Sequence, residues 1–506
     1  MIRFCQIGQK NKSRREWKAI RHDSFPLSRR IIYKGMIFLK YRLCDPYRLE
    51  GWKGLPSGVY DPVSGETFFL APEQYRLLLH MDGVEDLAED DLTPRQKEII
   101  QRLLSEKLIR SCDRDEPLAP EQKYRFFNRT YIAYVHWAIT GKCNYRCKHC
   151  YMYAPEARFP EPTMDQCRKI IRSMQDAGVR SIALTGGEPL VRGDFIELID
   201  EIVSGGIRVD SVYTNGALVT DRLLDELDAR GQKPRFHISF DGMEYHDWLR
   251  GIPGARDSAL RAIDICRAHG NEVYAAMCVH RKNRHELFET VRFLASRGVY
   301  RTRIKFMLPN GMWADGHAAD SLNVEEATDT VAEFIDAFFA HGMPAGVIVD
   351  NMFQYHQGQK CCVIPYARHC RQDAYLCTKA AVTPYIGPTG AVLPCMTLGG
   401  CDYQDSFPNI FETPLSEIMS ASYYRDVTHM TKKEFFDSHE ECRTCPARSV
   451  CTTGCRACTT RDFLELDQWN CIFLKGGYYR KIDEAIRRAI EKYQLGDEVS
   501  YTCITE

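Results

Sequence analysis

The 506-residue sequence lacks several features that would assign it to a whole class of protein. No uninterrupted apolar run is long enough to span a bilayer, and the N-terminus carries Lys and Arg but no apolar signal core. Acidic and basic residues nearly cancel, for a formal net charge of -1, so the chain has no overall basic field for nucleic acid. We therefore expect a cytoplasmic, globular protein that binds neither membrane nor nucleic acid.

Cysteine, by contrast, is abundant, with 22 residues. Most of the cysteines lie in a triad near residue 150 or between residues 361 and 471. In a chain without an export signal, such clustering indicates metal ligands in a reducing compartment, whereas structural disulfides would be spread along the chain.

The triad consists of Cys143, Cys147 and Cys150 in the stretch CNYRCKHCY, directly after the apolar run YVHWAIT (134–140), which predicts a buried strand. Three thiolates can hold three irons of a 4Fe-4S cubane and leave the fourth iron open to a small molecule. A structural zinc site usually closes with four ligands, and no fourth cysteine is nearby. His149 is a conceivable fourth donor.

The spacing CxxxCxxC, with an aromatic ring before the third cysteine, resembles the signature of the radical S-adenosylmethionine (SAM) family. The resemblance implies a 4Fe-4S cluster that binds S-adenosyl-L-methionine. Gly186, Gly187 and Glu188, in a GGEP stretch, match residue by residue the loop that holds the amino group of the cofactor. The other cofactor-binding candidates lie at or just after later strand ends and are Asn215, Ser239 and Arg250.

Strand-like and helical runs alternate from residue 131 to about 309, which predicts parallel strands with helical crossovers. The six runs predict an α/β fold with a partial (β/α)6 TIM-type barrel over residues 130–345. The polar motifs follow the carboxyl ends of the strands, where such barrels do chemistry. The expected strands are YVHWAIT, SIALTGG (181–187), VDSVYTNG (209–216), RFHISFDG (235–242), EVYAAMCVH (272–280) and RTRIKFMLP (301–309).

The second cysteine group matches the seven-cysteine pattern of SPASM domains, expected here over residues 360–475. The resemblance implies two auxiliary 4Fe-4S clusters, three clusters in all, with Cys370 as the eighth ligand. Cys361, Cys362 or Cys458 could replace an assigned ligand, and two zinc sites are the competing interpretation. One cluster would take Cys370, Cys377, Cys395 and Cys455, and the other Cys442, Cys445, Cys451 and Cys471.

The N-terminal region reads as a basic, mobile arm (1–35) and a small α+β domain (36–125). A hairpin over 58–70, with helices over 72–81 and 95–108, resembles the PqqD-like, winged-helix peptide-recognition element. Such a domain could bind a leader peptide as an added strand. An ordinary capping domain is the alternative. A C-terminal helix is expected within residues 476–506.

Together these resemblances imply a radical SAM/SPASM peptide maturase that uses a 5'-deoxyadenosyl radical to abstract hydrogen from a ribosomally made precursor peptide. We favour a thioether or carbon-carbon cross-link and expect an external low-potential electron donor. The alternatives are a peptide epimerase, a radical SAM enzyme for a small molecule, a sulfatase-type maturase and a non-catalytic zinc scaffold. Met396 argues against the sulfatase type, in which an Asp follows the cysteine that corresponds to Cys395.

Overall fold

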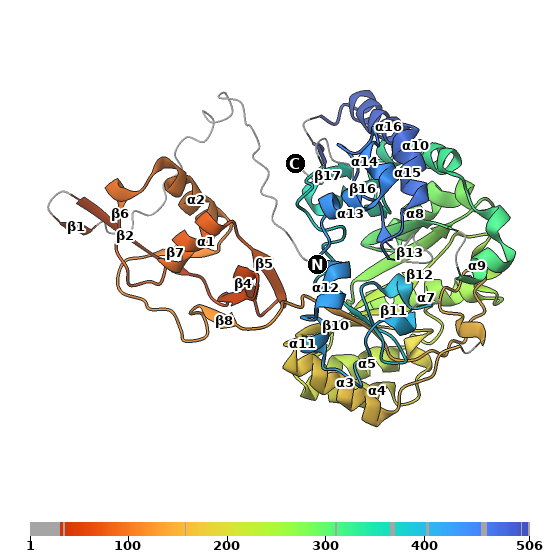
Figure 1. The fold of residues 1–506 in the computed structure, drawn as a ribbon, viewed down its shortest axis with the longest axis horizontal. Helices are drawn as coiled ribbons and strands as arrows, with labels where there is room; N and C mark the ends of the chain where they lie inside the picture. The colour runs from red at the N-terminus through yellow and green to blue at the C-terminus, as the bar shows by residue number, and fades with distance from the viewer. Residues whose placement is uncertain are drawn as a thin grey trace. The chain divides into compact units, whose positions relative to one another are not determined.

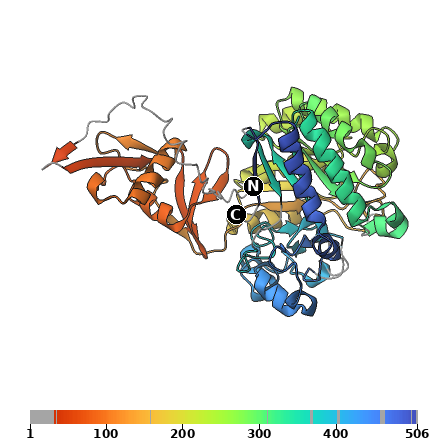
Figure 2. The same cartoon turned by 90° about the horizontal axis from the view of Figure 1, so that it is seen from above.

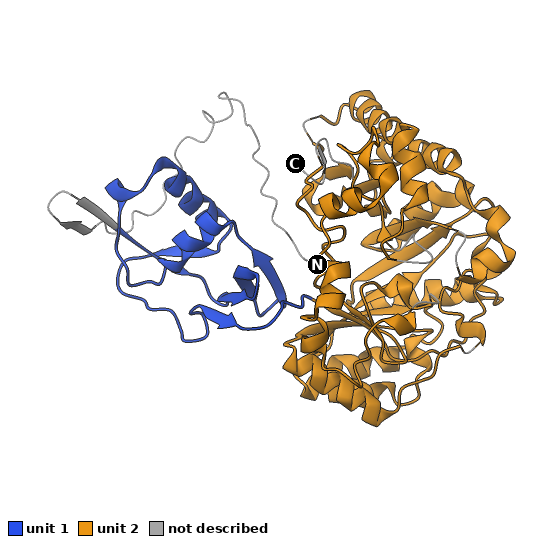
Figure 3. Ribbon diagram, viewed as in Figure 1, with its two compact units in different colours: residues 1–133 blue, residues 134–506 orange. Residues whose placement is uncertain are grey.

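The computed structural model describes residues 31–33, 36–156, 158–308, 311–364, 370–400, 404–456, 463–496 and 498–503. Nearly all of the predicted basic arm, together with Cys458, falls outside these ranges. The chain divides into two compact units, Met1–Ala133 and Tyr134–Glu506 (Figure 3). Within the described residues, no helix combines the length and the apolar character that a membrane crossing requires.

Unit 1 contains two four-stranded sheets. In the first, β2 pairs with each of the other strands; the strands are β1 (Ile31–Tyr33), β2 (Met36–Leu43), β6 (Leu87–Ala88) and β7 (Ile109–Cys112). The second runs in the order β5 (Glu66–Phe69), β4 (Leu55–Asp61), β3 (Arg48–Trp52) and β8 (Arg125–Phe127). In the described part of the sheet, β5 pairs only with β4 and is therefore an edge strand.

The hairpin and both helices expected in unit 1 are present. Strands β4 and β5 pair antiparallel, and the Asp61 carboxylate fixes their turn by accepting hydrogen bonds from the Val63 amide (2.9 Å) and the Ser64 hydroxyl (2.8 Å). The helices are α1 (Pro72–Leu79) and α2 (Pro94–Ser105). The strands outside this hairpin were not anticipated, and the winged-helix description stays a prediction.

Unit 2 is built on a twelve-stranded sheet. Seven consecutive strands are parallel, one more than the six expected. They are β9 (Val135–Ala138), β10 (Ser181–Thr185), β11 (Arg208–Thr214), β12 (Arg235–Ser239), β13 (Val273–Val279), β14 (Arg301–Phe306) and β15 (Gly346–Val349). The strand order is a linear path, and its description as a partial barrel stays a prediction.

Both ends of this sheet are completed by later segments of the chain. Beyond β15 lie β16 (Phe353–His356), β17 (Cys361–Ile364) and β20 (Ser500–Cys503). Beyond β9 lie β18 (Tyr385–Ile386), which pairs parallel to β9, and β19 (Val392–Leu393). The region of the second cysteine group therefore shares a sheet with the strand that precedes the triad.

Helices cover one face of the parallel strands (Figures 1 and 2). Helix α3 begins at a capping box in which Thr163 and Gln166 satisfy each other's backbone amides. Its buried stripe includes Cys167, which packs in the core as expected. The covering helices are α3 (Met164–Asp176), α4 (Phe195–Ser204), α5 (Asp221–Ala229), α7 (Ala255–Ala268), α8 (Leu287–Ser296) and α10 (Val324–Ala340).

The expected C-terminal helix is α16 (Tyr478–Lys492), which packs along α10 (Figure 2). Strand β20, which follows it, was not expected. The other helices are α6 (His246–Arg250), α9 (Gly311–Gly316), α11 (Leu415–Ile418), α12 (Ser422–Thr428), α13 (Lys432–Ser438), α14 (Glu440–Arg443) and α15 (Gln468–Lys475).

The two faces of the parallel sheet differ in burial. On β14, Thr302 and Ile304 are fully buried, whereas the alternating residues Arg301, Arg303 and Lys305 are not. Because successive side chains of a strand point to opposite faces, these three share the side of the sheet that faces away from α8. We call it the open face.

Candidate functional site

The triad loop follows β9 and is fastened to the GGE loop that follows β10. The Gly187 amide donates a hydrogen bond to the Thr140 carbonyl (2.9 Å), and the Glu188 amide donates to the Lys142 carbonyl (2.8 Å). A Cβ would come within 2.3 Å of the Thr140 oxygen at Gly186, and within 2.2 Å of the Lys142 oxygen at Gly187. Only glycine permits this close approach.

On its other side, the triad loop rests on the end of α6. The Arg146 amide donates to the Arg250 carbonyl (3.2 Å), and the Lys148 amide donates to the Leu249 carbonyl (2.9 Å). Gly251 has a φ of +67°, and a Cβ there would lie 2.3 Å from the Arg146 oxygen. The loop is therefore held on two sides, by the GGE loop and by the end of α6.

The three triad thiols lie within electrostatic range of one another. Burial raises the pKa of each thiol, in the case of Cys143 to about 12. The Tyr145 amide points at the Cys143 sulfur (3.4 Å) and the Ala154 amide at the Cys150 sulfur (3.4 Å). Clustered, partly buried thiols that already receive N–H donors suit a bound metal, which would keep them deprotonated. The donor set fits a three-thiolate 4Fe-4S cluster.

Glu188 is buried beside this loop, with 1% of its surface exposed. Its carboxylate accepts hydrogen bonds from the Thr214 hydroxyl (2.8 Å), the Asn215 amide (2.7 Å) and the Leu190 amide (3.2 Å). Burial raises the pKa of Glu188 to about 7. Among the described residues no cation pairs with this carboxylate, so an ammonium group of a ligand would supply the missing charge.

The other expected cofactor residues are placed differently. The Asn215 side chain donates to the Asn144 side-chain oxygen (2.8 Å) and so helps to fasten the triad loop. Ser239 ends β12 on the open face. Arg250 points Nη1 at the Cys147 sulfur (3.9 Å) but places Nε 2.6 Å from the Asp241 carboxylate. Arg250 thus already has a carboxylate partner within the protein, Asp241, which would compete with a carboxylate of the cofactor.

Asp241, which lies in the expected strand RFHISFDG (235–242) and was not singled out there, contacts several parts of the site. It is fully buried, and its carboxylate also accepts the Cys278 amide (2.9 Å), while its carbonyl accepts the Asn283 side chain (2.8 Å). Burial alone would raise the pKa of Asp241, but the Arg250 guanidinium together with the His246 and His149 rings outweighs it, so the pKa lies well below its usual range. The available signal was an acid at a strand end followed, nine residues on, by an arginine.

His149 lies inside the triad loop as a neutral ring. Burial, with the nearby Arg250 charge, lowers the pKa of His149 to about 3. Its Nδ1 is buried and has no hydrogen-bond partner among the described residues. Both alternatives, a ring that packs beside a cluster and a nitrogen donor, fit this position.

The second cysteine group begins against the triad loop. Cys377, Cys395 and Cys150 pack around one apolar cluster that contains Met152. A Cβ on Gly400 would lie 1.6 Å from the Tyr151 carbonyl oxygen, so the two segments nearly touch. Cys455 is within electrostatic range of Cys377 and donates its amide to the Asp467 carboxylate (3.0 Å).

The remaining four thiols of the pattern line one small cavity together with apolar side chains such as Phe436 and Leu474. The sulfur of one of them, Cys451, accepts the Thr453 amide at 3.3 Å. The cavity brings together the four thiols that the sequence assigned to one auxiliary cluster, Cys442, Cys445, Cys451 and Cys471.

The expected eighth ligand, Cys370, and the neighbouring Cys361 and Cys362 do not line this cavity. Cys370 donates its amide to the Ser449 carbonyl (2.7 Å) and packs in the same apolar cluster as Cys442 and Cys451. Its assignment to the cluster of Cys377 stays a prediction. Cys361 and Cys362 lie on β17, and Cys362 is fully buried in the core. The environment of Cys362 favours a packing role.

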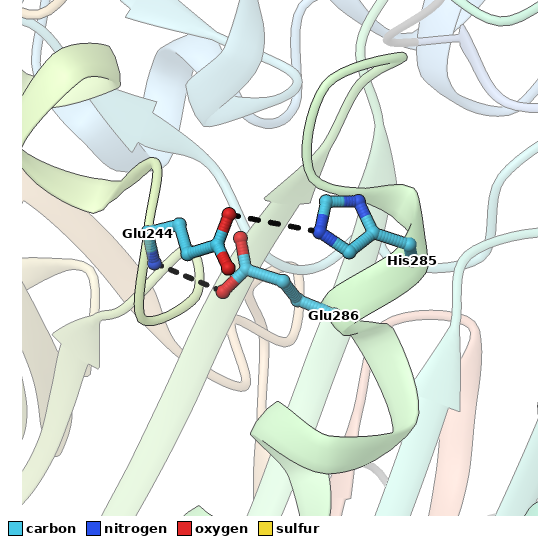
Figure 4. Close-up of side chains that lie close together, drawn as sticks. All are labelled: Glu244, His285 and Glu286. Carbon is cyan, nitrogen blue, oxygen red and sulfur yellow. Dashed lines mark hydrogen bonds and ion pairs between the residues drawn. The ribbon is translucent and has the colours of Figure 1, made fainter.

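One further group of ligand-type side chains lies on the loops after β12 and β13: Glu244, His285 and Glu286 (Figure 4). The ligand atoms lie within 4.8 Å of one another, and Glu244 and His285 are exposed. The Glu286 carboxylate accepts the amides of Met243 (2.6 Å) and Glu244 (3.0 Å). Glu286 therefore fixes the turn that carries Asp241.

The sequence pattern of the radical SAM superfamily matches residues 137–294, and that of the SPASM iron-sulfur cluster-binding domain matches residues 377–446. An AdoMet-dependent heme synthase from Nitratidesulfovibrio vulgaris is 28% identical over 339 residues, which cover 64% of this chain and 87% of that protein. The subtilosin biosynthesis protein AlbA from Bacillus subtilis is 27% identical over 290 residues, covering 55% of this chain and 59% of AlbA.

Among solved structures, Streptococcus suis SuiB bound to its precursor peptide SuiA superposes with a TM-score of 0.53 at 14% identity. The match covers 82% of this chain and 96% of SuiB. At this identity the likeness establishes the fold alone. The chain therefore contains a radical SAM domain followed by a SPASM iron-sulfur cluster-binding domain.

Proposed function

We propose that this enzyme modifies a ribosomally made precursor peptide, forming a thioether or carbon-carbon cross-link. The observation that carries the proposal is one site in which three partly buried thiols on the triad loop lie within electrostatic range of one another, next to a loop that carries a buried carboxylate without a cationic partner among the described residues, Glu188. When bound, the cluster and S-adenosyl-L-methionine supply a 5'-deoxyadenosyl radical that abstracts hydrogen from an unactivated carbon.

The residues of the chain have separate roles in this site. Cys143, Cys147 and Cys150 would hold the cluster. Glu188 would hold the ammonium of the cofactor, because it is ionisable near pH 7 and has three hydrogen-bond donors to orient it. Asp241 positions the Arg250 guanidinium beside the Cys147 sulfur.

The second thiol group would hold two auxiliary clusters, three clusters in all. The residues fit this use, since four thiols line one cavity and Cys377, Cys395 and Cys455 lie near one another. An auxiliary cluster can accept an electron from a substrate radical, which suits a net oxidation such as cross-linking. The first electron would come from an external low-potential donor.

A peptide substrate is supported by the relatives and by the extent of the chain. AlbA is a bacteriocin biosynthesis protein, and SuiB was solved with a precursor peptide. The SuiB superposition covers a larger share of this chain than unit 2 represents, so it includes part of unit 1. We propose that unit 1 binds the leader peptide in the manner of PqqD-like domains, with the edge strand β5 as one place for an added strand.

A second candidate is a radical SAM enzyme for a carboxylated small molecule such as a tetrapyrrole. It is favoured by the heme synthase, which is matched over 87% of its own length. That match spans only 64% of this chain. Peptide epimerisation, a third chemistry, would leave the product mass unchanged.

The test is co-expression of the chain with precursor peptides encoded by neighbouring short reading frames, followed by mass spectrometry. A loss of two hydrogens per modification is expected, and it should be absent with Cys147→Ala. Altered stereochemistry at constant mass would indicate epimerisation. If Cys147→Ala reconstituted under argon with dithionite still forms 5'-deoxyadenosine as the parent does, the proposal is wrong.

A further inference from the structure

The open face of the sheet carries an excess of positive charge next to the site. Three cations of one strand, β14, lie on this face at alternating positions: Arg301, Arg303 and Lys305. Alternation puts all three on one side of the sheet. Lys379 lies within electrostatic range of Arg303 and adds a fourth cation.

Most of this charge is not neutralised by the protein. The Arg303 guanidinium pairs with the Asp350 carboxylate at 2.8 Å. Arg301 stacks on the Tyr274 ring at 4.7 Å and has no acidic partner within ion-pair distance among the described residues. The Lys305 side chain likewise makes no hydrogen bond and no ion pair with any residue that the structure describes. A half-buried ammonium without a partner is poised to take a ligand anion.

Strand register places Lys305 beside the reactive centre. Lys305 lies directly across from Cys278 on β13, and the Cys278 amide donates to the Asp241 carboxylate (2.9 Å). Asp241 in turn holds Arg250 against Cys147. Since paired strands lie about 4.8 Å apart, an anion on Lys305 would sit one strand away from the residues that support the triad.

Aromatic rings continue the open face beside these cations. The Tyr213 and His237 rings stack at 4.2 Å, and Tyr274 meets His237 edge-on at 4.9 Å. Burial, together with the nearby Arg301 charge, lowers the pKa of His237 to about 3, so its ring is neutral at pH 7. A flat neutral strip next to free cations suits a substrate with both an apolar body and an anionic end.

We propose that Lys305, supported by Arg301 and Arg303, binds a carboxylate of the substrate on the open face. This inference rests on the proposed radical SAM function and specifies its substrate class. The carboxylate could belong to an acidic residue of a peptide or to a propionate of a tetrapyrrole. Both sources offer the same chemistry to an ammonium group.

The cofactor's own carboxylate is the competing occupant of this position. Its ammonium would bind Glu188, at the end of β10, and β14 lies four strands further along the sheet. The affinity for the cofactor is therefore measured beside the affinity for the probes.

The experiment measures equilibrium binding to the full-length, anaerobically reconstituted chain. The probes are coproporphyrin III with its neutral amide, and a short glutamate-containing peptide with its glutamine analogue. For at least one pair we expect the carboxylate form to bind about tenfold more tightly. Lys305→Gln should lose that preference and Lys305→Arg should keep it. Lys233→Gln is the matched control, since Lys233 is exposed and pairs with Asp228.

The outcomes separate this inference from the function on which it rests. Equal binding of charged and neutral forms by the parent, or an unchanged preference in Lys305→Gln, overturns the carboxylate site. If Lys305→Gln weakens the binding of SAM but leaves the binding of the probes unchanged, the carboxylate site is overturned as well. Failure of the parent to form 5'-deoxyadenosine from SAM would instead refute the proposed function. The peptide and porphyrin pairs identify which source of carboxylate is used.

Discussion

Replacing Glu188 with Gln should remove a pH dependence from the stability of the cofactor-free protein. Burial raises the pKa of Glu188 from 4.5 to about 7 in the folded chain. Between these values the folded state keeps a proton that the unfolded state has lost, so stability falls as pH rises. The full penalty above pH 7 is about 3.4 kcal/mol, at 1.36 kcal/mol per pKa unit. About 2 kcal/mol of it accrues between pH 5.5 and pH 8.

The assay is urea unfolding of the parent and Glu188→Gln at pH 5.5 and pH 8, without SAM. The absolute stability of the variant is not diagnostic, because a Gln amide would face the Asn215 amide donor and lose a hydrogen bond. The difference between the two pH values is diagnostic. The parent should lose about 2 kcal/mol more than the variant on going to pH 8. Glu197→Gln is the control, since Glu197 is exposed and pairs with Arg168.

An equal pH dependence in the parent and Glu188→Gln would refute this reasoning, because it would mean that the buried carboxylate is ionised throughout. The protonation state of Glu188 should also control the binding of SAM. An ammonium ligand needs the ionised form of Glu188, so SAM binding to the parent should weaken by about tenfold between pH 8 and pH 6. Isothermal titration at the two pH values measures this change.

Three further changes test the rest of the site. Asp241→Asn should destabilise unit 2 by about 3–5 kcal/mol, because it leaves the buried Arg250 charge unpaired. Urea unfolding measures this change, and a loss below about 1 kcal/mol would contradict it. Gly400→Ala should loosen the second cysteine region, since its Cβ would overlap the Tyr151 carbonyl; faster limited proteolysis after residue 400 is the expected readout. Cys471→Ala should lose the iron of one auxiliary cluster but keep SAM cleavage, measured by iron analysis and 5'-deoxyadenosine formation.

The sequence predicted the strands that carry the site because long apolar runs mark them. The six runs from residue 134 onward correspond to β9 through β14 in the expected order. Strand β15 was missed because GVIV is a short apolar run that periodicity cannot distinguish from a buried turn. The two-residue strands β18 and β19 are too short to leave any periodic signal.

The GGE residues were named through the family resemblance. Their loop lies against the triad loop because its backbone amides pair with the carbonyls of Thr140 and Lys142. Arg250 was named without its partner, since the Asp241 contact depends on how α6 turns back onto β12. The position of the β14 cations on the open face could not be predicted either. Alternation shows that the three side chains share one side of the strand, but it does not show which side the helices leave uncovered.

The two cysteine regions are parts of one folded body rather than modules joined by a linker. Strand β18 extends the sheet at β9, the strand that leads into the triad loop, and Cys150 shares an apolar cluster with Cys377 and Cys395. Separating the regions would break sheet hydrogen bonds and expose this cluster, so their spacing is set by packing. A substrate on the open face would therefore meet the triad and the first auxiliary thiols at fixed distances, a requirement for electron transfer that follows hydrogen abstraction on the same molecule.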